Sequence, residues 1–534
     1  MDYLYNPHPS TRHTVFAKNG MVATSQPLAA QAGIEIMRRG GNAIDAAIAT
    51  AAALTVVEPT SNGIGGDAFA LVWVNNKLHG LNASGPAPQS LTIDAVKARG
   101  HDKMPVHGLT PITVPGVPAA WAELARKFGK LPLKESLEPA IRYAEEGYPL
   151  TPILGKYWSA AYKKYSTSFT TEEFDAWFTT FAPDGRAPEI GELWKSPNHA
   201  ATLQSIGASN AESFYTGELA DKIDAFMQQH GGFLTKTDLA NYQPEWVEPV
   251  STNYRGYDVH EIPPNGQGMI ALMALNILSE MNTPVPHDTQ SLHNQIESMK
   301  LAFTDGQAFI TEPSAMPIKT ENLLSKAYAQ QRAAKIAATA THPEPYELPK
   351  GGTVYLATAD GEGNMVSFIQ SNYMGFGSGI VIPGTGIALQ NRGADFSLDP
   401  NHPNVLKPGK RTFHTIIPGF LTKNGQAVGP FGIMGGYMQP QGHFQVAINT
   451  IDYKLNPQAA LDAPRWQWIK DNLVHVEPGF PNHLAQALTR LGHQIQPTLD
   501  SGSFGRGQII WRNPETGVLS GGTESRTDGA IAVW

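Results

Sequence analysis

Thr353 combines residue type and position in a way that could support covalent chemistry. It follows Gly351-Gly352 and begins an apolar run. Peptide cleavage before this threonine would create a new N-terminus, at which one residue carries both a hydroxyl nucleophile and an amine base, a pairing used in covalent catalysis. Gly-Gly-Thr alone is more often a turn entering a strand. Other segments of the chain must therefore decide between the two interpretations.

The flanks of Thr353 predict a junction between a loop and a strand. Residues 341–350 are polar and proline-rich, a composition typical of an exposed, mobile segment. After Thr353 the pattern predicts a strand, a turn over 360–364 and a second strand, Met365–Ser371. This arrangement would place Thr353 at the open end of a hairpin.

The elements that must position this hairpin follow from the hydrophobic patterning of the whole chain. Strands are predicted near both ends, and a long helical stretch with one hairpin-like interruption lies between them. The predicted strands before Thr353 are 20–24, 69–74 and 77–81; the predicted helices are 28–39 and 43–57, the helical middle 117–330 interrupted near 250–262, and 437–451, 456–463 and 481–491. Strands at both ends with helices between them predict a sheet-on-sheet core with helical outer layers.

Composition excludes several classes of function. The net charge is −8, the pI is about 6.1, and basic residues form no cluster, so nucleic acid and anionic membranes are poor partners. The 534 residues include no cysteine, which excludes thiolate metal sites and cysteine nucleophiles. No secretion signal, membrane span, phosphate loop or His-Glu-x-x-His motif is found, so we expect a cytoplasmic protein with no cofactor and no metal.

Several short motifs, in matching order from about Gly20 to Gly529, resemble those of the γ-glutamyltransferase (γ-glutamyltranspeptidase) family. They are Gly20-Met21-Val22-Ala23-Thr24, Gly40-Gly41-Asn42-Ala43-Ile44-Asp45-Ala46-Ala47, Glu58-Pro59, Gly63-Ile64-Gly65-Gly66, Asp238-Leu239-Ala240-Asn241-Tyr242, Tyr254-Arg255-Gly256-Tyr257 and Gly432-Ile433-Met434-Gly435-Gly436. The resemblance implies an α+β fold, the four-layer αββα sandwich of the N-terminal-nucleophile (Ntn) hydrolases. It also implies a precursor that cuts itself between Gly352 and Thr353. Segments 1–352 and 353–534 would then be a helix-rich large subunit and a strand-rich small subunit of one domain.

The resemblance also assigns catalytic roles. The spacing from Thr353 to Asn364 matches that from the family nucleophile to its Asp-x-x-Gly-Asn turn, and Ser371 matches a hydroxyl that hydrogen-bonds the threonine amine. Gly435 and Gly436 lie where a strand is expected to meet a helix. Backbone N–H groups at such a junction can stabilise an oxyanion.

The expected substrate-binding residues include four departures from the family pattern. Asp395 matches the aspartate that receives a substrate ammonium, but the position of the carboxylate-binding arginine is occupied by Ser84. His414 and Thr415 replace paired serines, Tyr373 replaces an asparagine and Arg392 replaces a glutamine. A guanidinium can hold a carboxylate through two hydrogen bonds, so Arg392 is a candidate replacement for the missing arginine.

Three functions remain open on this sequence. The first is an amidohydrolase or acyltransferase that cleaves a γ-glutamyl amide such as glutathione through an acyl-threonine intermediate. The second is a hydrolase of a smaller dicarboxylic amide (oxamate-like) or a glutaryl amide, without transpeptidation. The third is an uncleaved, non-catalytic binder. For an enzyme we expect a small-molecule amide substrate and a heterodimer of the two segments, or a dimer of such heterodimers.

Overall fold

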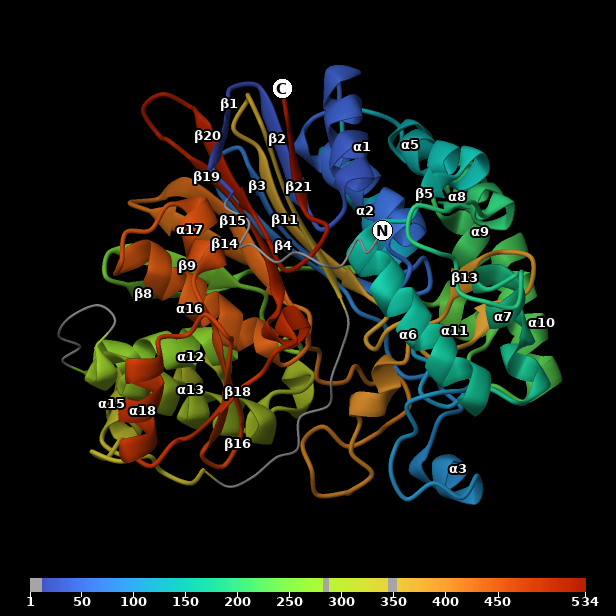
Figure 1. Ribbon diagram of the computed structural model, residues 1–534. Coiled ribbons are helices and arrows are strands. Elements are labelled where there is room, and N and C mark those ends of the chain that lie inside the picture. The colour runs from blue at the N-terminus through green and yellow to red at the C-terminus, as the bar shows by residue number, and fades with distance from the viewer. Residues whose placement is uncertain (1–11, 282–287, 344–352) are drawn as a thin grey trace.

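Two antiparallel seven-stranded sheets lie face to face in the computed structural model, which describes residues 12–281, 288–343 and 353–534 (Figure 1). The first sheet has the order β1 (Val15–Ala17), β20 (Leu519–Thr523), β19 (Arg506–Arg512), β15 (Gln426–Met434), β14 (Gly419–Lys423), β9 (Tyr257–Glu261) and β8 (Val250–Tyr254). The second has the order β21 (Ala530–Val533), β2 (Gly20–Thr24), β10 (Val354–Asp360), β11 (Met365–Ser371), β3 (Asp67–Val74), β4 (Lys77–Ala83) and β7 (Glu245–Val247).

Helices cover the outer face of each sheet (Figure 1). The second sheet is covered by α1 (Pro27–Arg38) and α2 (Ala43–Val57), with α4 (Val117–Phe128), α5 (Leu133–Glu146) and α8 (Pro197–Ser209) nearby. The first sheet is covered by α12 (Gly268–Ser279), α16 (Met438–Ile451) and α17 (Pro457–Asp462), with α13 (Thr289–Phe309) and α18 (Asn482–Arg490) beyond them. The expected four-layer αββα fold and its placement of helices are confirmed.

The hydrophobic core is layered in the same way. One buried cluster lies under α1 and α2, a second lies under α12, α13 and α16, and a third fills the space between the sheets. All fifteen residues of α2 are buried, and most of them are small, which allows close approach to the sheet. The predicted boundaries 20–24 and 43–57 coincide with β2 and α2.

The hairpin of β10 and β11 connects this core to the predicted nucleophile. Its turn is closed by Asp360, whose Oδ1 accepts hydrogen bonds from the N–H groups of Glu362 and Asn364, both at 3.0 Å. Asp360 Oδ2 also accepts from Ala43 N at 2.9 Å, which ties the turn to the N-terminus of α2. The register pairs Val354 with Gln370. Thr353 therefore lies opposite Ser371 at the open end of the hairpin, as the sequence predicts.

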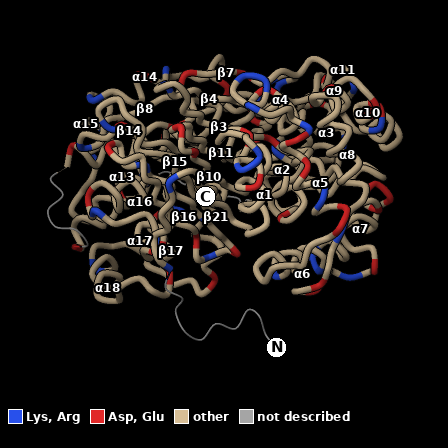
Figure 2. Tube along the Cα trace, turned by 90° about the horizontal axis from the view of Figure 1, so that it is seen from above, with Lys and Arg blue, Asp and Glu red and all other residues tan. Residues whose placement is uncertain are grey.

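Charged residues are interspersed along the chain (Figure 2). No described helix has both the length and the apolar composition needed to cross a bilayer. Gly352 and most of the proline-rich stretch, 344–350, lie outside the described residues.

Candidate active site

Thr353 and Ser371 form the centre of the site. Thr353 Oγ1 donates a hydrogen bond to Ser371 Oγ at 3.2 Å, and both residues are buried. The same Ser371 oxygen accepts from the N–H of Tyr373 at 2.8 Å. Tyr373 has a φ of +77°, a conformation rare for residues with side chains. The serine therefore links the predicted nucleophile to a strained backbone position.

Asp395 lies in a cage of three side chains. Its Oδ1 accepts hydrogen bonds from the phenols of Tyr373, at 2.5 Å, and Tyr437, at 3.1 Å. Its Oδ2 lies 3.4 Å from Arg392 Nη1. Burial raises the pKa of Asp395, while Arg392 opposes the shift. Both oxygens are therefore already engaged, so a substrate ammonium would have to compete with these partners.

Arg392 is completely buried and only partly used by the protein. Nη1 donates to Thr415 Oγ1 at 2.7 Å, and the guanidinium carbon lies 4.0 Å from the centre of the Tyr373 ring. Nε and Nη2 have no hydrogen-bond partner among the described residues. A buried guanidinium with unused donors is suited to a planar anion such as a carboxylate.

His414 is buried and makes a hydrogen bond to Asp67 that the sequence does not predict. The N–H of Ile416 donates to His414 Nδ1 at 3.3 Å, so the ring proton lies on Nε2, 3.0 Å from Asp67 Oδ2. Burial lowers the pKa of His414 well below its usual value, and Arg392 lowers it further. The imidazole is therefore neutral. Its place in substrate binding stays a prediction.

Asp67 lies next to Ser371 in the sheet, because β3 and β11 pair these two residues. Its Oδ1 accepts from Gly85 N at 3.1 Å and from Gln390 Nε2 at 2.9 Å. Burial raises the pKa of Asp67 to about 7, against the opposing charge of Arg392. The sequence analysis did not single out Asp67. The one signal that could have identified it is its position, directly after Gly65-Gly66 and before an apolar strand.

Gly435 and Gly436 follow β15 and precede α16, as predicted. Their φ values of +140° and +59° favour glycine, and a Cβ at Gly435 would lie 3.0 Å from Gly505 Cα. Neither N–H donates to a backbone or side-chain acceptor within the described part of the chain. The turn thus presents two adjacent donors, which an anionic oxygen could accept.

A second guanidinium approaches the position where the family arginine was missing. Arg411 Nε donates to the carbonyl oxygen of Ser84 at 2.9 Å, although the residues are 327 positions apart in the chain. Its Nη1 pairs with Glu245 at 2.8 Å. The sequence carried no signal for this contact, because the two segments meet only in the folded chain.

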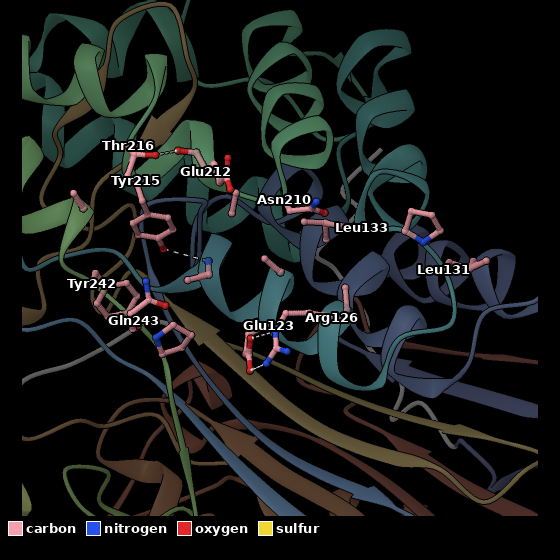
Figure 3. Close-up of a pocket in the computed structure, with 17 residues that line it drawn as sticks. Glu123, Arg126, Leu131, Leu133, Asn210, Glu212, Tyr215, Thr216, Tyr242 and Gln243 are labelled. Carbon is pink, nitrogen blue, oxygen red and sulfur yellow. Dashed lines mark hydrogen bonds and ion pairs between the residues drawn. The ribbon is translucent and has the colours of Figure 1, made fainter.

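A cavity of about 720 Å³ lies beside α4 (Figure 3). Its walls include Glu123 and Arg126 of α4 and the stacked rings of Tyr215 and Tyr242. It contains none of the predicted site residues. A narrow cleft lined by Asp395, Asn404 and Tyr437 lies closer to the predicted chemistry.

His293, Glu297 and His493 lie close enough for a metal ion, with donor atoms within 4.8 Å of one another. Glu297 is already engaged, because Lys300 Nζ lies 2.7 Å from its Oε1 and Thr341 N donates to its Oε2 at 3.1 Å. The ammonium group supplies the positive charge that a metal ion would bring. We interpret the cluster as a buried polar network, so it carries no metal assignment.

Comparison with known proteins places this geometry in a family. The family described as Gamma-glutamyltranspeptidase matches residues 29–534. The glutathione hydrolase-like YwrD proenzyme of Bacillus subtilis (strain 168) is 37% identical over 97% of this chain and 99% of its own length. The oxamate amidohydrolase proenzyme of Klebsiella pneumoniae is 33% identical over 96% and 98%. The crystal structure of cephalosporin acylase from Bacillus halodurans is 66% identical, with a TM-score of 0.97 over 99% of this chain and 98% of that one.

The αββα sandwich is therefore that of the Ntn hydrolases. Within that superfamily, the chain belongs to the γ-glutamyltranspeptidase family and is an amidohydrolase or acylase of that family.

Proposed function

We propose that the protein is a precursor that cuts its own Gly352–Thr353 bond and then uses Thr353 to hydrolyse a small amide whose acyl group carries a carboxylate. The observation that carries the proposal is the placement of Thr353. Thr353 is buried and lies directly before β10, and its hydroxyl donates a hydrogen bond to Ser371 Oγ at 3.2 Å. The relatives named proenzymes support self-processing, and segments 1–352 and 353–534 would remain together as a heterodimer.

In the proposed reaction, Thr353 Oγ attacks the amide carbon while its freed α-amine takes the hydroxyl proton. The N–H groups of Gly435 and Gly436 stabilise the negative oxygen of the tetrahedral intermediate. The carbon–nitrogen bond then breaks, and the leaving amine receives the proton. Water releases the acyl group from the threonine ester and regenerates the enzyme.

Two observations support the proposed acyl group. Arg392 keeps Nε and Nη2 without a partner in the described residues, which suits a carboxylate. Asp395 accepts two phenols on Oδ1 and faces Arg392 on Oδ2, which leaves little capacity for an α-ammonium. This geometry favours a dicarboxylic amide of the oxamate or glutaryl type, hydrolysed without transpeptidation. A γ-glutamyl amide is the second candidate, supported by the name of the YwrD relative.

Intact-mass analysis and a substrate panel test the proposal together. Wild-type protein should appear as two pieces with masses of 1–352 and 353–534, whereas Thr353→Ala should stay whole because the attacking hydroxyl is absent. The cleaved protein is then assayed with γ-glutamyl, glutaryl and oxalyl (oxamate-type) amides of the same amine. Full-length wild-type protein without turnover would instead support a non-catalytic binder.

Tyr437→Phe distinguishes the two candidate substrates. It removes one of the phenols on Asp395 and keeps the ring that stacks on Phe413. If Asp395 is closed to ammonium groups by its phenols, the ratio of γ-glutamyl to glutaryl turnover should rise in this variant. An unchanged ratio, with wild type already preferring the γ-glutamyl amide, would support the second candidate.

A further inference from the structure

The structure assigns a positioning role to Gln267, a residue outside every motif discussed above, and this inference rests on the proposed function. Gln267 lies directly before α12 and is completely buried. Its side-chain Nε2 has two hydrogens, and both are used. One is donated to the carbonyl oxygen of Thr415 at 2.5 Å and the other to that of Gly436 at 2.9 Å.

These two carbonyls belong to different parts of the predicted site. Thr415 receives Arg392 Nη1 on its hydroxyl at 2.7 Å, so it belongs to the carboxylate-binding side. Gly436 belongs to the turn with the two unused N–H groups. Gln267 is therefore a brace between the group that would hold the substrate and the group that would stabilise the oxyanion.

The brace completes a ring of contacts. From Gly436 the chain continues to Tyr437, whose phenol donates to Asp395 at 3.1 Å. Asp395 faces Arg392 at 3.4 Å, and Arg392 returns to Thr415. Five members of this ring follow Thr353 in the sequence: Arg392, Asp395, Thr415, Gly436 and Tyr437. Gln267 is the one member of the ring that precedes Thr353. If the chain is cut before Thr353, Gln267 is the large-subunit contribution to the ring.

The backbone on both sides of Gln267 fixes its position. Its own N–H donates to the carbonyl of His414 at 2.9 Å, and the N–H of His414 donates to that of Asn265 at 2.9 Å. The side chain of Asn265 also donates to the carbonyl of Thr412 at 2.8 Å. The glutamine is thus held against the 412–415 segment before its side chain reaches Gly436, so its geometry is pre-organised.

The expected consequence is a change in kcat with little change in KM. Without the brace, the Gly436 carbonyl keeps, among the residues that the structure describes, only the N–H of Gln439, at 3.1 Å, and the glycine turn can shift relative to Arg392. Substrate would still bind through the guanidinium, but the oxyanion donors would be misplaced. Small misplacements of this kind lower turnover by about 10-fold to 100-fold.

Three variants test the role. Gln267→Met keeps the length of the side chain and removes both donors. Gln267→Glu keeps the shape and places a carboxylate against two carbonyl oxygens. Gln445→Met is the matched control, because Gln445 is also buried and its Nε2 also bridges two carbonyls, those of Gln441 and Trp466, neither of which belongs to this ring. Each kcat is normalised to the cleaved fraction measured by intact mass.

We expect kcat to fall at least about 10-fold in both Gln267 variants, with KM within about two-fold of wild type. The control should lose thermal stability and keep its kcat. Gln267→Glu should also recover activity as the pH falls, because a protonated carboxyl donates one hydrogen bond. The kcat of Gln267→Glu is divided by that of Gln267→Met at each pH. Asp67, Asp395, Glu261 and the histidines titrate in both variants, so their effect on kcat cancels in this ratio.

Normal kcat in cleaved Gln267→Met would overturn the proposal. An equal loss of kcat in Gln445→Met would also overturn it, as would a kcat ratio of Gln267→Glu to Gln267→Met that does not change with pH. A folded Gln267→Met that never self-cleaves would also overturn it, since the residue would then act on processing rather than on turnover. Absence of turnover in cleaved wild-type protein on every amide of the panel would instead count against the proposed function.

Discussion

Arg392 divides its donors between the protein and a prospective ligand. Nη1 holds Thr415 and faces Asp395, while Nε and Nη2 have no described acceptor. Arg392→Gln should therefore lower kcat/KM for amides with an acyl carboxylate by about 10-fold to 150-fold, equivalent to the 1.5–3 kcal/mol of a hydrogen bond to a charged group. Matched amides without the carboxylate should be little affected.

Arg392→Lys serves as the control, because it keeps the charge and loses the planar pair of donors. Its loss on carboxylate amides should be intermediate. If both substrate types lose activity equally in Arg392→Gln, the arginine supports the fold around Asp395 rather than the substrate.

Asp67 should make stability depend on pH. Its pKa is about 7 in the folded protein because of burial, against an ordinary value of 3.8. Between these values the folded state holds a proton that the unfolded state has released. The contribution of Asp67 to the free energy of unfolding is therefore fully present below about pH 4. It is lost as the pH rises towards 7, by at most about 1.4 kcal/mol per pH unit.

The difference in unfolding free energy between wild type and Asp67→Asn isolates this contribution, since other groups titrate in both proteins. Measured by urea unfolding at several pH values, wild-type stability should decline relative to the variant between about pH 4 and pH 7. A difference that does not change with pH would mean that the three donors around the carboxylate keep it ionised throughout.

At the scale of elements, the sequence predicts those helices and hairpins whose stabilising contacts join residues close together in the chain. The helix at 43–57 and the hairpin after Thr353 were predicted from an alanine-rich apolar stretch and from a Gly-rich turn between two apolar runs. In the structure an Asn42–Asp45 capping box begins the helix, and Asp360 closes the turn. The contacts of Arg411 with Ser84 and of His414 with Asp67 were missed. Their partners come from distant segments, so no periodicity or spacing in one segment records them. The role of Gln267 was missed for the same reason.

The close approach of two elements at Gly66 yields a further prediction. A Cβ at Gly66 would lie 2.5 Å from the carbonyl oxygen of Ser371, a backbone atom at the end of β11 that cannot move without the strand. Gly66→Ala should displace Ser371 from Thr353 and lower kcat, with a loss of about 1–3 kcal/mol of stability from overpacking.

Gly479→Ala is the control, because its added Cβ meets only Pro464, at 3.5 Å. Thermal unfolding and kcat of both cleaved variants give the comparison. Gly66→Ala with wild-type kcat would show that β11 tolerates the shift, and that the bond between Ser371 and Thr353 is not sensitive to this contact.

At the scale of the molecule, each sheet takes strands from both sides of Thr353. In the second sheet β10 lies between β2 and β11, and β11 pairs with β3; in the first sheet β14 pairs with β9. Cleavage before Thr353 would therefore leave the strand pairing intact. We expect the cleaved pieces to purify together and to unfold in one cooperative transition.

Segment 353–534 expressed alone should not fold cooperatively. Without the strands that precede Thr353, β10 and β11 each lose one neighbour, and the apolar faces covered by α2 and α12 become exposed. Circular dichroism during urea unfolding should show a broad change, whereas the same segment co-expressed with 1–352 should regain the sharp transition of the cleaved protein. A sharp transition in the isolated segment would mean that it is a domain in its own right, and that the first segment adds to a fold that already exists.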